Sequence, residues 1–266
     1  MTQATSPTSD KKSEYAIEVA DLHKSFGKFH VHKGINIKIK RGTITYIMGG
    51  SGVGKSVLLK EIMGFVRPDS GEIKVNGESL SGVDSHHMKE IRRGMGILFQ
   101  NGALFDSLTV YDNVSFALKE QLNMSKRETD ARVDELLKSV GLTFEHSAKM
   151  PNELSGGQRK RVALARAIAL QPSIMMYDEP TTGLDPITTE MVTNLIRDTN
   201  AQHQLTTLVI SHDIHVAFDV AEEIAFLQDG VVKFFGPPEM VWSQSDPETK
   251  AFFKSEAKRL GIKGDR

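Results

Sequence analysis

The sequence predicts an α/β fold in which a parallel sheet of the P-loop type carries the core, with an antiparallel β subdomain and an inserted α-helical subdomain. A strictly alternating run at 35–40 marks a half-buried antiparallel strand. A glycine-rich loop at 49–56 lies between an apolar strand pattern and a helical pattern. From residue 174 onward, strand and helix patterns alternate again. These three observations favour a mixed sheet followed by a parallel one.

The composition narrows the possible classes of protein. The 266 residues suffice for one large domain or a domain with a subdomain, and the formal net charge of −1 offers no basic field for nucleic acid. The absence of cysteine excludes disulfides and thiolate metal sites. The polar segment 1–14 reads as a disordered lead-in without the apolar core of a signal peptide. No apolar run approaches the ~20 residues that span a bilayer, so we expect membrane contact only through partners.

The first half of the chain reads as short strands on either side of the glycine-rich loop. A turn is expected at 25–29, and apolar residues at helical spacing behind the loop predict a helix that ends at Gly64. The last strand of this half ends on Gln100. The expected strands lie at 17–22, 35–40, 43–48, 72–77 and 94–100.

The second half begins with helices and returns to alternating strands and helices. The pattern is helical over 109–141, with a capping box formed by Ser125 and Glu128. Pro186 suits the first turn of a later helix, and Asp213 caps a further one. Strands are expected at 174–177 and 205–210, and a hairpin at 224–235. The expected division is a domain at 15–240, a helical subdomain inserted at about 101–170, and a C-terminal extension at 241–266.

The loop at 49–56 has the composition and context of a phosphate-binding P-loop. Its glycines allow the backbone to form a concave nest of N–H groups, and the following helix adds its positive dipole end. Lys55 supplies a cation for the outer phosphates, and the Ser56 hydroxyl suits a phosphate-bound Mg²⁺. The plain alternative is a glycine-rich turn that binds nothing. The candidate nucleotide-binding residues are Gly49, Gly50, Ser51, Gly52, Val53, Gly54, Lys55, Ser56 and Val57.

Two adjacent carboxylates, Asp178 and Glu179, follow the apolar strand 174–177. They stand at the edge where α/β sheets bind ligands. In a P-loop protein Asp178 would hold Mg²⁺ through water, and Glu179 would take a proton from the attacking water as a general base. A charged pair at a strand exit is otherwise common, and Lys55 upstream favours the functional interpretation.

A second anion-binding helix start is predicted at 154–158. A serine and two glycines precede a helix that we expect from about 158 to 170. A chain with one P-loop has no evident use for a second γ-phosphate site, so this helix start would close over the ATP held by another subunit. A serine-capped turn without a ligand describes the same local structure. The candidate residues are Ser155, Gly156, Gly157 and Gln158.

Taken in order, these stretches resemble the nucleotide-binding subunit of an ABC transporter over about residues 15–240. The loop 49–56 is similar to the Walker A motif, 154–158 to the ABC signature and 174–179 to the Walker B strand. The resemblance implies an ATPase that uses ATP and Mg²⁺ and works as a head-to-tail homodimer. Each ATP would then lie between Walker A of one chain and the signature of the other.

Further residues receive a role only through this resemblance. Gln100 falls at the Q-loop and would contact Mg²⁺ and the attacking water, while His212 at the switch position would bond the γ-phosphate. Asp185, in the D-loop, would reach across the dimer. Phe26 would stack on adenine, with Phe29 as its rival. Taken alone, these residues have ordinary alternatives: a surface glutamine, a loop histidine, a helix cap and core aromatics.

The stretch 99–110, together with 183–187, resembles the Mla-type phospholipid-transport ATPases (the MlaF family) of Gram-negative envelopes. Apolar residues at 103–105 would seat a helix of a membrane subunit, or pack between the subdomain and the core. The resemblance implies three partners: an integral membrane permease, an MCE-type lipid-binding protein and a STAS-domain protein. It also implies a position at the cytoplasmic face of the inner membrane. The work would be phospholipid transport between inner and outer membranes, which maintains outer-membrane lipid asymmetry.

Other classes of function stay open at this point. Another ABC transporter with small-molecule cargo, or a soluble ABC ATPase, would share every nucleotide motif. Soluble ABC ATPases usually carry a coiled-coil or zinc insertion or a second cassette, and this chain has neither. The signature argues against a small-molecule kinase.

The sequence pattern of the tail 247–266 predicts an amphipathic helix. Its apolar residues, which lie among charged ones, are Phe252, Phe253, Leu260 and Ile262. Our hypothesis is that it packs on the neighbouring ATPase subunit or on an accessory protein. The alternative is a surface helix that folds back on its own domain.

Overall fold

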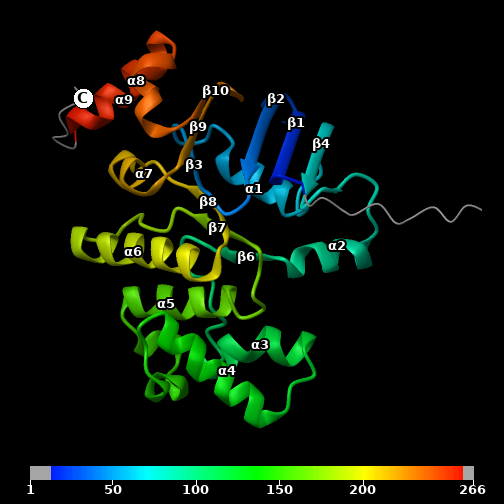
Figure 1. Cartoon of the computed structure of the whole chain (residues 1–266), viewed down its shortest axis with the longest axis vertical. Helices are drawn as coiled ribbons and strands as arrows, with labels where there is room; N and C mark the ends of the chain where they lie inside the picture. Colours follow the sequence, from blue (N-terminus) through cyan, green and yellow to red (C-terminus); the bar gives the residue numbers. More distant parts are fainter. Residues whose placement is uncertain (1–12, 260–266) are drawn as a thin grey trace, which may run out of the picture.

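The strands form two sheets in the computed structural model, which describes residues 13–259 (Figure 1). The first sheet is antiparallel, with strand order β2-β1-β4-β5. The alternating strand predicted at 35–40 is the second half of β2 and pairs with β1. The bounds are β1 (Tyr15–Phe26), β2 (Phe29–Lys40), β4 (Ser70–Val75) and β5 (Glu78–Ser79).

The second sheet carries the glycine-rich loop and has the strand order β10-β9-β3-β8-β7-β6. The strands from β9 to β6 are parallel to one another, whereas β9 and β10 form the hairpin predicted at 224–235. The predicted α/β fold with a parallel core sheet is confirmed. The bounds are β3 (Ile44–Met48), β6 (Met95–Leu98), β7 (Ile174–Asp178), β8 (Thr206–Ile210), β9 (Glu223–Gln228) and β10 (Val231–Gly236).

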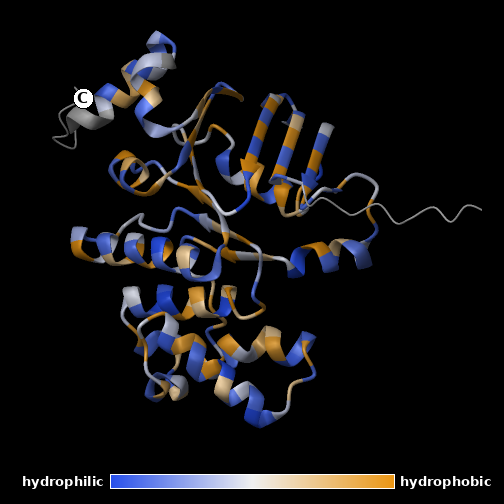
Figure 2. Ribbon diagram, in the orientation of Figure 1, coloured by the Kyte–Doolittle hydropathy of each residue, from blue (hydrophilic) through white to orange (hydrophobic). Residues whose placement is uncertain are grey.

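The second sheet is buried on both faces and separates two hydrophobic cores. Along β3, Tyr46 and Met48 belong to one core and Ile47 to the other, as the strand period of two requires. Helices α5 (Gly156–Ala167), α6 (Pro186–His203) and α7 (Ile214–Val220) share the first core. Helix α1 (Lys55–Ile62) packs in the second core, together with the first sheet. Double burial explains the continuous apolar runs of these strands, in contrast to the blue and orange bands on β1 and β2 (Figure 2).

Three helices of the predicted subdomain lie together at one end of the molecule (Figure 1). They are α3 (Val110–Gln121), α4 (Lys126–Ser139) and α5, and the predicted capping box of Ser125 and Glu128 begins α4. Short 3₁₀ turns at Phe144–Ala148 and Pro151–Glu153 connect α4 to α5. The domain limits themselves stay a prediction. None of the helices within residues 13–259 is long and apolar enough to cross a membrane.

Helix α2 (Ser85–Arg93) has no counterpart among the expected elements. Only Met88 and Ile91 among its residues are large and apolar, which is too short a pattern for a helix to be recognised from sequence, and no residue of the helix is buried. Asp84 begins it by accepting hydrogen bonds from the backbone N–H groups of His86 and His87, at 2.9 Å each. Element ends also differ: the strand expected at 72–77 spans Ser70–Val75, and the strand expected at 17–22 is longer and spans Tyr15–Phe26.

The C-terminal helix α9 (Pro247–Arg259) packs on its own domain, beyond a 3₁₀ turn at Pro238–Met240 and the short α8 (Val241–Gln244). Phe253 is fully buried, and the centroids of the Phe226, Phe218 and Trp242 rings lie 5.2, 5.9 and 6.3 Å from its own. The structure therefore favours the alternative that the tail folds back, because its aromatic side chains are covered within the chain. Leu260 and Ile262 lie outside the described residues.

We expect Phe253→Ala to destabilise the protein by roughly 3–5 kcal/mol, because it removes a fully buried ring from an aromatic cluster. Denaturant unfolding, followed by the fluorescence of the single tryptophan, Trp242, measures this directly. Lys254→Ala is the matched control, since that neighbouring side chain is exposed. Equal stability of the two variants would contradict the docking of α9.

Candidate active site

Four parallel strands bring predicted site residues to one edge of the second sheet. β3 leads into the glycine-rich loop, β6 leads to Gln100, β7 ends at Asp178 beside Glu179, and β8 leads to His212. The register aligns these exits, since Asp178 pairs with Ile210 at the end of β8. The carboxyl edge of the sheet therefore collects residues that are up to 163 positions apart, as the positions 49 and 212 show.

A cavity of about 610 Å³ opens at this edge, within the size range of small-molecule sites. The predicted loop residues line it, except Val53, and so do Gln100, Glu179 and His212. Val31, Thr182 and Phe252 also line it and were not predicted. Thr182 follows the Walker B-like strand, but no sequence pattern pointed to Val31, or to Phe252 in the distant tail.

Two glycines of the loop lie where a side chain would clash with neighbouring atoms. A Cβ on Gly49 would lie 2.2 Å from the Leu227 carbonyl oxygen of the neighbouring strand. Gly54 has φ +106, and a Cβ there would lie 2.7 Å from Nε2 of the His32 side chain. A side chain at either position would therefore displace the loop.

Lys55 is held inside the loop. Its side chain is largely buried, and its Nζ donates hydrogen bonds to the carbonyl oxygens of Gly49 and Gly50, at 2.9 and 3.0 Å. Burial lowers the pKa of Lys55, while the carboxylates of Glu179 and Asp178 act in the opposite direction. A buried ammonium group of this kind is stabilised when an anion enters the cavity.

Ser56 and Asp178 form the side of the site that suits a hard cation. The Ser56 hydroxyl donates to Oδ1 of Asp178 at 3.2 Å. Burial raises the pKa of Asp178, as does the nearby Glu179, and the hydrogen bond from Ser56 opposes this rise. The ionised form of Asp178 is therefore unfavourable in the free protein, and a cation at this point would stabilise it.

Glu179 is held in a strained backbone conformation beside His212. Its φ of +50 lies in the left-handed region, which is uncommon for non-glycine residues and occurs at turns and functional sites. Its Oε2 lies 2.8 Å from Nδ1 of His212 and accepts a hydrogen bond from the Thr182 hydroxyl, also at 2.8 Å. One carboxylate oxygen thus connects the end of β7 with the loop after β8.

The other predicted residues line a separate cavity of about 590 Å³. Ser155 caps α5 through the hydroxyl that accepts from the Gln158 N–H at 3.2 Å, and the Gln158 side chain accepts from the Ser155 N–H at 3.0 Å. Asp185 caps α6 by accepting from the Thr188 N–H at 3.0 Å. Gly156 and Gly157 complete this second group. These predicted residues therefore lie apart from the first cavity, in a cavity of their own.

The two aromatic residues considered for adenine stacking lie outside both cavity linings. Phe26 and Phe29 face each other across the turn between β1 and β2 and are 49% and 79% exposed. The role of Phe26 stays a prediction. Phe252 of α9 is the aromatic residue that does line the first cavity.

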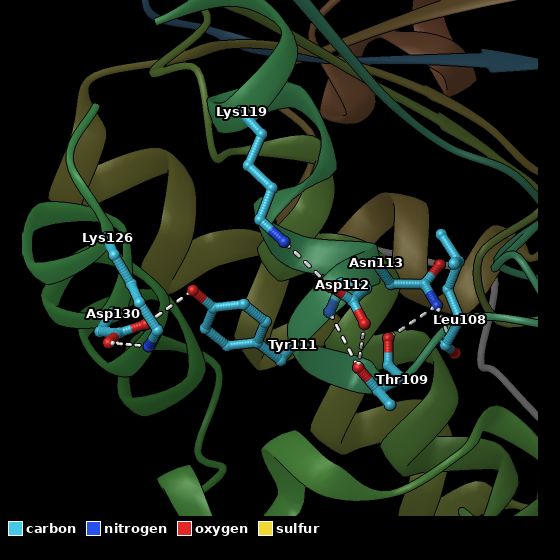
Figure 3. Close-up of polar contacts among 8 residues, drawn as sticks. All are labelled: Leu108, Thr109, Tyr111, Asp112, Asn113, Lys119, Lys126 and Asp130. Carbon is cyan, nitrogen blue, oxygen red and sulfur yellow. Dashed lines mark hydrogen bonds and ion pairs between the residues drawn. The ribbon is translucent and has the colours of Figure 1, made fainter. Parts of the chain in front are cut away.

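The segment that follows Gln100 is fastened to the helical subdomain (Figure 3). The fully buried Asn113 of α3 accepts from the Phe105 N–H at 2.8 Å and donates to carbonyl oxygens of the same segment. These acceptors are Phe105 at 3.1 Å, Leu108 at 3.1 Å and Thr109 at 3.0 Å. Arg166 of α5 holds the carbonyls of Gly102 and Ala103, at 2.9 and 2.8 Å. A movement of the subdomain would therefore pull on the segment beside Gln100.

Helices α3 and α4 are joined by a smaller polar group, also drawn in Figure 3. The Tyr111 hydroxyl donates to Asp130 at 2.6 Å, and Lys126 pairs with the same carboxylate at 2.8 Å. Lys119 pairs with Asp112 within α3, at 2.9 Å. These contacts join α3 to α4 within the subdomain.

The apolar residues 103–105 divide between the two uses that we considered. Leu104 packs against the first core. Phe105 is 44% exposed, with Phe116 at 5.1 Å between ring centroids and the Arg166 guanidinium at 5.5 Å. An exposed aromatic side chain therefore lies in the segment that follows Gln100.

Comparison with known proteins identifies the architecture. Residues 32–182 match the model of the ABC transporter family. The intermembrane phospholipid transport system ATP-binding protein MlaF of Haemophilus influenzae is 39% identical over 91% of this chain and 91% of its own. MlaF of Escherichia coli is 37% identical over 89% of this chain and 87% of its own. A probable ribonucleotide transport ATP-binding protein, mkl of Mycobacterium leprae, is 39% identical over 92% of this chain and 70% of its own.

Solved structures show the same fold. CbiO1 from Clostridium perfringens, part of the ABC transporter complex cbiONQ, superposes with a TM-score of 0.80 at 30% identity, over 94% of this chain and 97% of its own. The ATP-binding cassette MJ0796, in a dimeric post-hydrolysis state with ADP and Pi, gives a TM-score of 0.76 at 34% identity, over 84% and 98%.

We expect Asp178→Asn to stabilise the ligand-free protein at neutral pH. Burial raises the pKa of Asp178, so the folded protein favours the protonated carboxyl group more than the unfolded chain does. This preference stabilises the folded protein fully at a pH below the pKa of the unfolded chain. The stabilisation is lost as the pH rises through the folded pKa. The asparagine variant escapes this loss, so its melting temperature should exceed that of the wild type by about 2–4 °C at pH 8 and by less at pH 5.

Calorimetry across this pH range measures the difference, with Asp69→Asn as the control of opposite sign. The pKa of Asp69 is lowered by hydrogen bonds from Lys24 and Ser25, so its loss should not stabilise the protein at neutral pH. An Asp178→Asn variant that melts below the wild type at pH 8 would refute the electrostatic description of this side chain.

Proposed function

The chain belongs to the ABC transporter family, and we propose that its ATP hydrolysis powers phospholipid transport between the inner and outer membranes, which maintains lipid asymmetry of the outer membrane. The observation that carries this proposal is the match to the two MlaF proteins, which covers nearly nine-tenths or more of both chains. The mkl relative, named for ribonucleotides, has about a third of its length outside the match. ATP hydrolysis itself follows from the family.

The first cavity would hold the triphosphate. The N–H groups of the loop and of the first turn of α1 would contact the phosphates, and Lys55 would exchange its two carbonyl partners for phosphate oxygens. The Ser56–Asp178 pair supports an Mg²⁺ site, because this ion prefers one or two protein oxygen ligands with phosphates and water. The residues 13–259 contain no group of three or more His, Asp or Glu that would bind a metal without nucleotide. Gln100 lines the cavity where it would contact the ion and the water.

Glu179 is the proposed general base. It lies in the cavity wall, and its carboxylate accepts hydrogen bonds that hold it in one orientation. His212, which now contacts Glu179, would turn its other ring nitrogen toward the γ-phosphate. Between them these two side chains would orient and deprotonate the water that attacks the γ-phosphate.

A homodimer completes the site. Because Ser155, Gly156, Gly157, Gln158 and Asp185 line a cavity of their own, they are free to close over an ATP held by a second copy of the chain. The solved dimers of the related cassette support this arrangement. ATP would then hold the dimer closed, and hydrolysis would release it.

The proposed partners follow the same relatives. An integral membrane permease would contact the chain near the exposed Phe105, and the movement would reach Gln100 through the segment that Asn113 and Arg166 hold. We also propose an MCE-type lipid-binding protein and a STAS-domain protein as further partners. The chain would act as a peripheral subunit on the cytoplasmic face of the inner membrane in a Gram-negative bacterium.

Reconstitution tests the cargo. The tagged chain, purified with the multi-pass membrane protein that accompanies it, is placed in liposomes that contain a fluorescent phospholipid. We expect ATP-dependent transfer of the lipid to an acceptor protein or vesicle, and no transfer with Glu179→Gln. ATP-dependent movement of a labelled ribonucleotide without lipid transfer would favour the alternative that the mkl name suggests, and co-purification of nucleic acid would favour a soluble ATPase.

We expect Glu179→Gln to bind ATP with unchanged affinity and to lose at least about 100-fold in kcat, because it removes only the general base. Lys55→Ala should instead weaken ATP binding about tenfold or more, since it removes a charge-assisted contact to phosphate. Fluorescence titration with a labelled ATP and a phosphate-release assay separate the two effects. Glu190→Gln, an exposed glutamate on α6, is the matched control. Full turnover by Glu179→Gln would remove this residue as the base.

A further inference from the structure

Two buried ionisable side chains, His32 of β2 and Glu61 of α1, lie behind the glycine-rich loop and have no part in the steps above. Both side chains are 0% exposed, and Nδ1 of His32 lies 2.8 Å from Oε2 of Glu61. On the other side of the ring, Nε2 lies 3.2 Å from the carbonyl oxygen of Gly54, the residue before Lys55. The ring thus connects a carboxyl group to the backbone of the phosphate-binding loop.

The chemistry of the acceptors fixes one proton on the ring. A carbonyl oxygen only accepts hydrogen bonds, so Nε2 must carry a hydrogen. On the other side of the ring, Nδ1 lies 2.8 Å from Oε2 of Glu61, an ion-pair distance, although neither atom has a hydrogen-bond partner within residues 13–259. The Nε2–H group therefore makes the hydrogen bond of this ring, and it faces Gly54.

Stability does not account for this pair. Nδ1 of His32 and both carboxylate oxygens of Glu61 have no hydrogen-bond partner within residues 13–259, so the pair is incompletely satisfied. Buried ion pairs commonly fold no better than hydrophobic side chains of similar volume in the same place. The contact that distinguishes His32 from an apolar residue is the one to the loop.

This contact determines the direction of a peptide group. The Gly54 carbonyl and the Lys55 N–H belong to one peptide unit, and in a trans peptide they point in opposite directions. A donor that holds the carbonyl from behind the loop therefore directs the Lys55 N–H toward the cavity. The same carbonyl also accepts from Leu58 N–H at 2.9 Å, the first helical bond of α1. The ring can come this close only because residue 54 is glycine.

We propose that His32 and Glu61 are a positioning pair that orients the Lys55 amide toward the nucleotide phosphates. The proposal rests on the phosphate site described under the proposed function. Glu61 acts by keeping the Nε2–H form of His32 in place, and His32 acts on the loop. Neither side chain touches the nucleotide.

The test compares variants that separate folding from positioning. His32→Phe with Glu61→Leu replaces the pair by apolar side chains of similar shape, and His32→Phe/Glu61→Met repeats the test should the first variant fold poorly. Glu61→Gln is the rescue variant, because its amide N–H can donate to Nδ1 and leave Nε2–H facing Gly54. Asn200→Leu is the control for a lost buried polar contact. Asn200 bonds Leu205 and Thr207 at the amino end of β8, on the opposite edge of the sheet.

We expect the apolar double variant to melt at or above the wild-type temperature, yet to bind ATP about fivefold more weakly, the effect of one lost hydrogen bond. KM should rise by the same factor and kcat should change by less than about twofold, because the amide contact is equal in ground and transition states. Glu61→Gln should bind ATP like the wild type. Asn200→Leu should melt lower with unchanged ATP affinity.

A stable double variant with wild-type ATP affinity and KM would overturn the proposal. So would a Glu61→Gln variant that binds as weakly as the double variant. If the loop were not the phosphate-binding site at all, the result would differ, because the wild type and Lys55→Ala would then bind ATP equally.

Discussion

Burial of the second sheet on both faces is the constraint on which the rest of the structure depends. The strands β3, β8, β7 and β6 run parallel to one another and have a hydrophobic core on each side, as is typical of parallel sheets. Parallel strands end at the same edge, so the glycine-rich loop, Gln100, Glu179 and His212 come to that edge as a consequence of packing. The site is therefore a product of the core, and each predicted site side chain follows the end of a largely buried strand.

In the ligand-free protein the site contains charged groups whose burial is unfavourable, and ligands of opposite charge would reduce this free-energy cost. Lys55 is a buried cation with a lowered pKa, and Asp178 is a half-buried acid with a raised one, so burial disfavours the charged form of each in the free protein. The triphosphate supplies the anion for the first and a magnesium ion would supply the cation for the second. Glu179 adds backbone strain to these costs. Binding energy is thus available to change the state of the protein, which is what an energy-coupling subunit requires.

The sequence was sufficient for the parallel sheet, the caps at Ser125, Ser155 and Asp213, and the grouping of residues around the loop, because each depends on a local pattern or a strand end. The sequence did not predict helix α2, whose residues are all at least partly exposed. It also did not predict that Phe252 lines the first cavity, since the contacts of the distant tail follow from tertiary packing. The link between His32 and the loop was missed for the same reason. The tail was expected to reach a neighbour, whereas its aromatic residues cover the edge of their own domain.

The central claim is that one chain holds half of each ATP site. Sedimentation of two variants with saturating ATP tests it most directly: Glu179→Gln, and Glu179→Gln combined with Ser155→Arg, which obstructs the second cavity only. The account predicts that both bind ATP with the same affinity as monomers, and that ATP drives only the first to a dimer. Dimerisation of both variants, or loss of monomer ATP binding with Ser155→Arg alone, would contradict it.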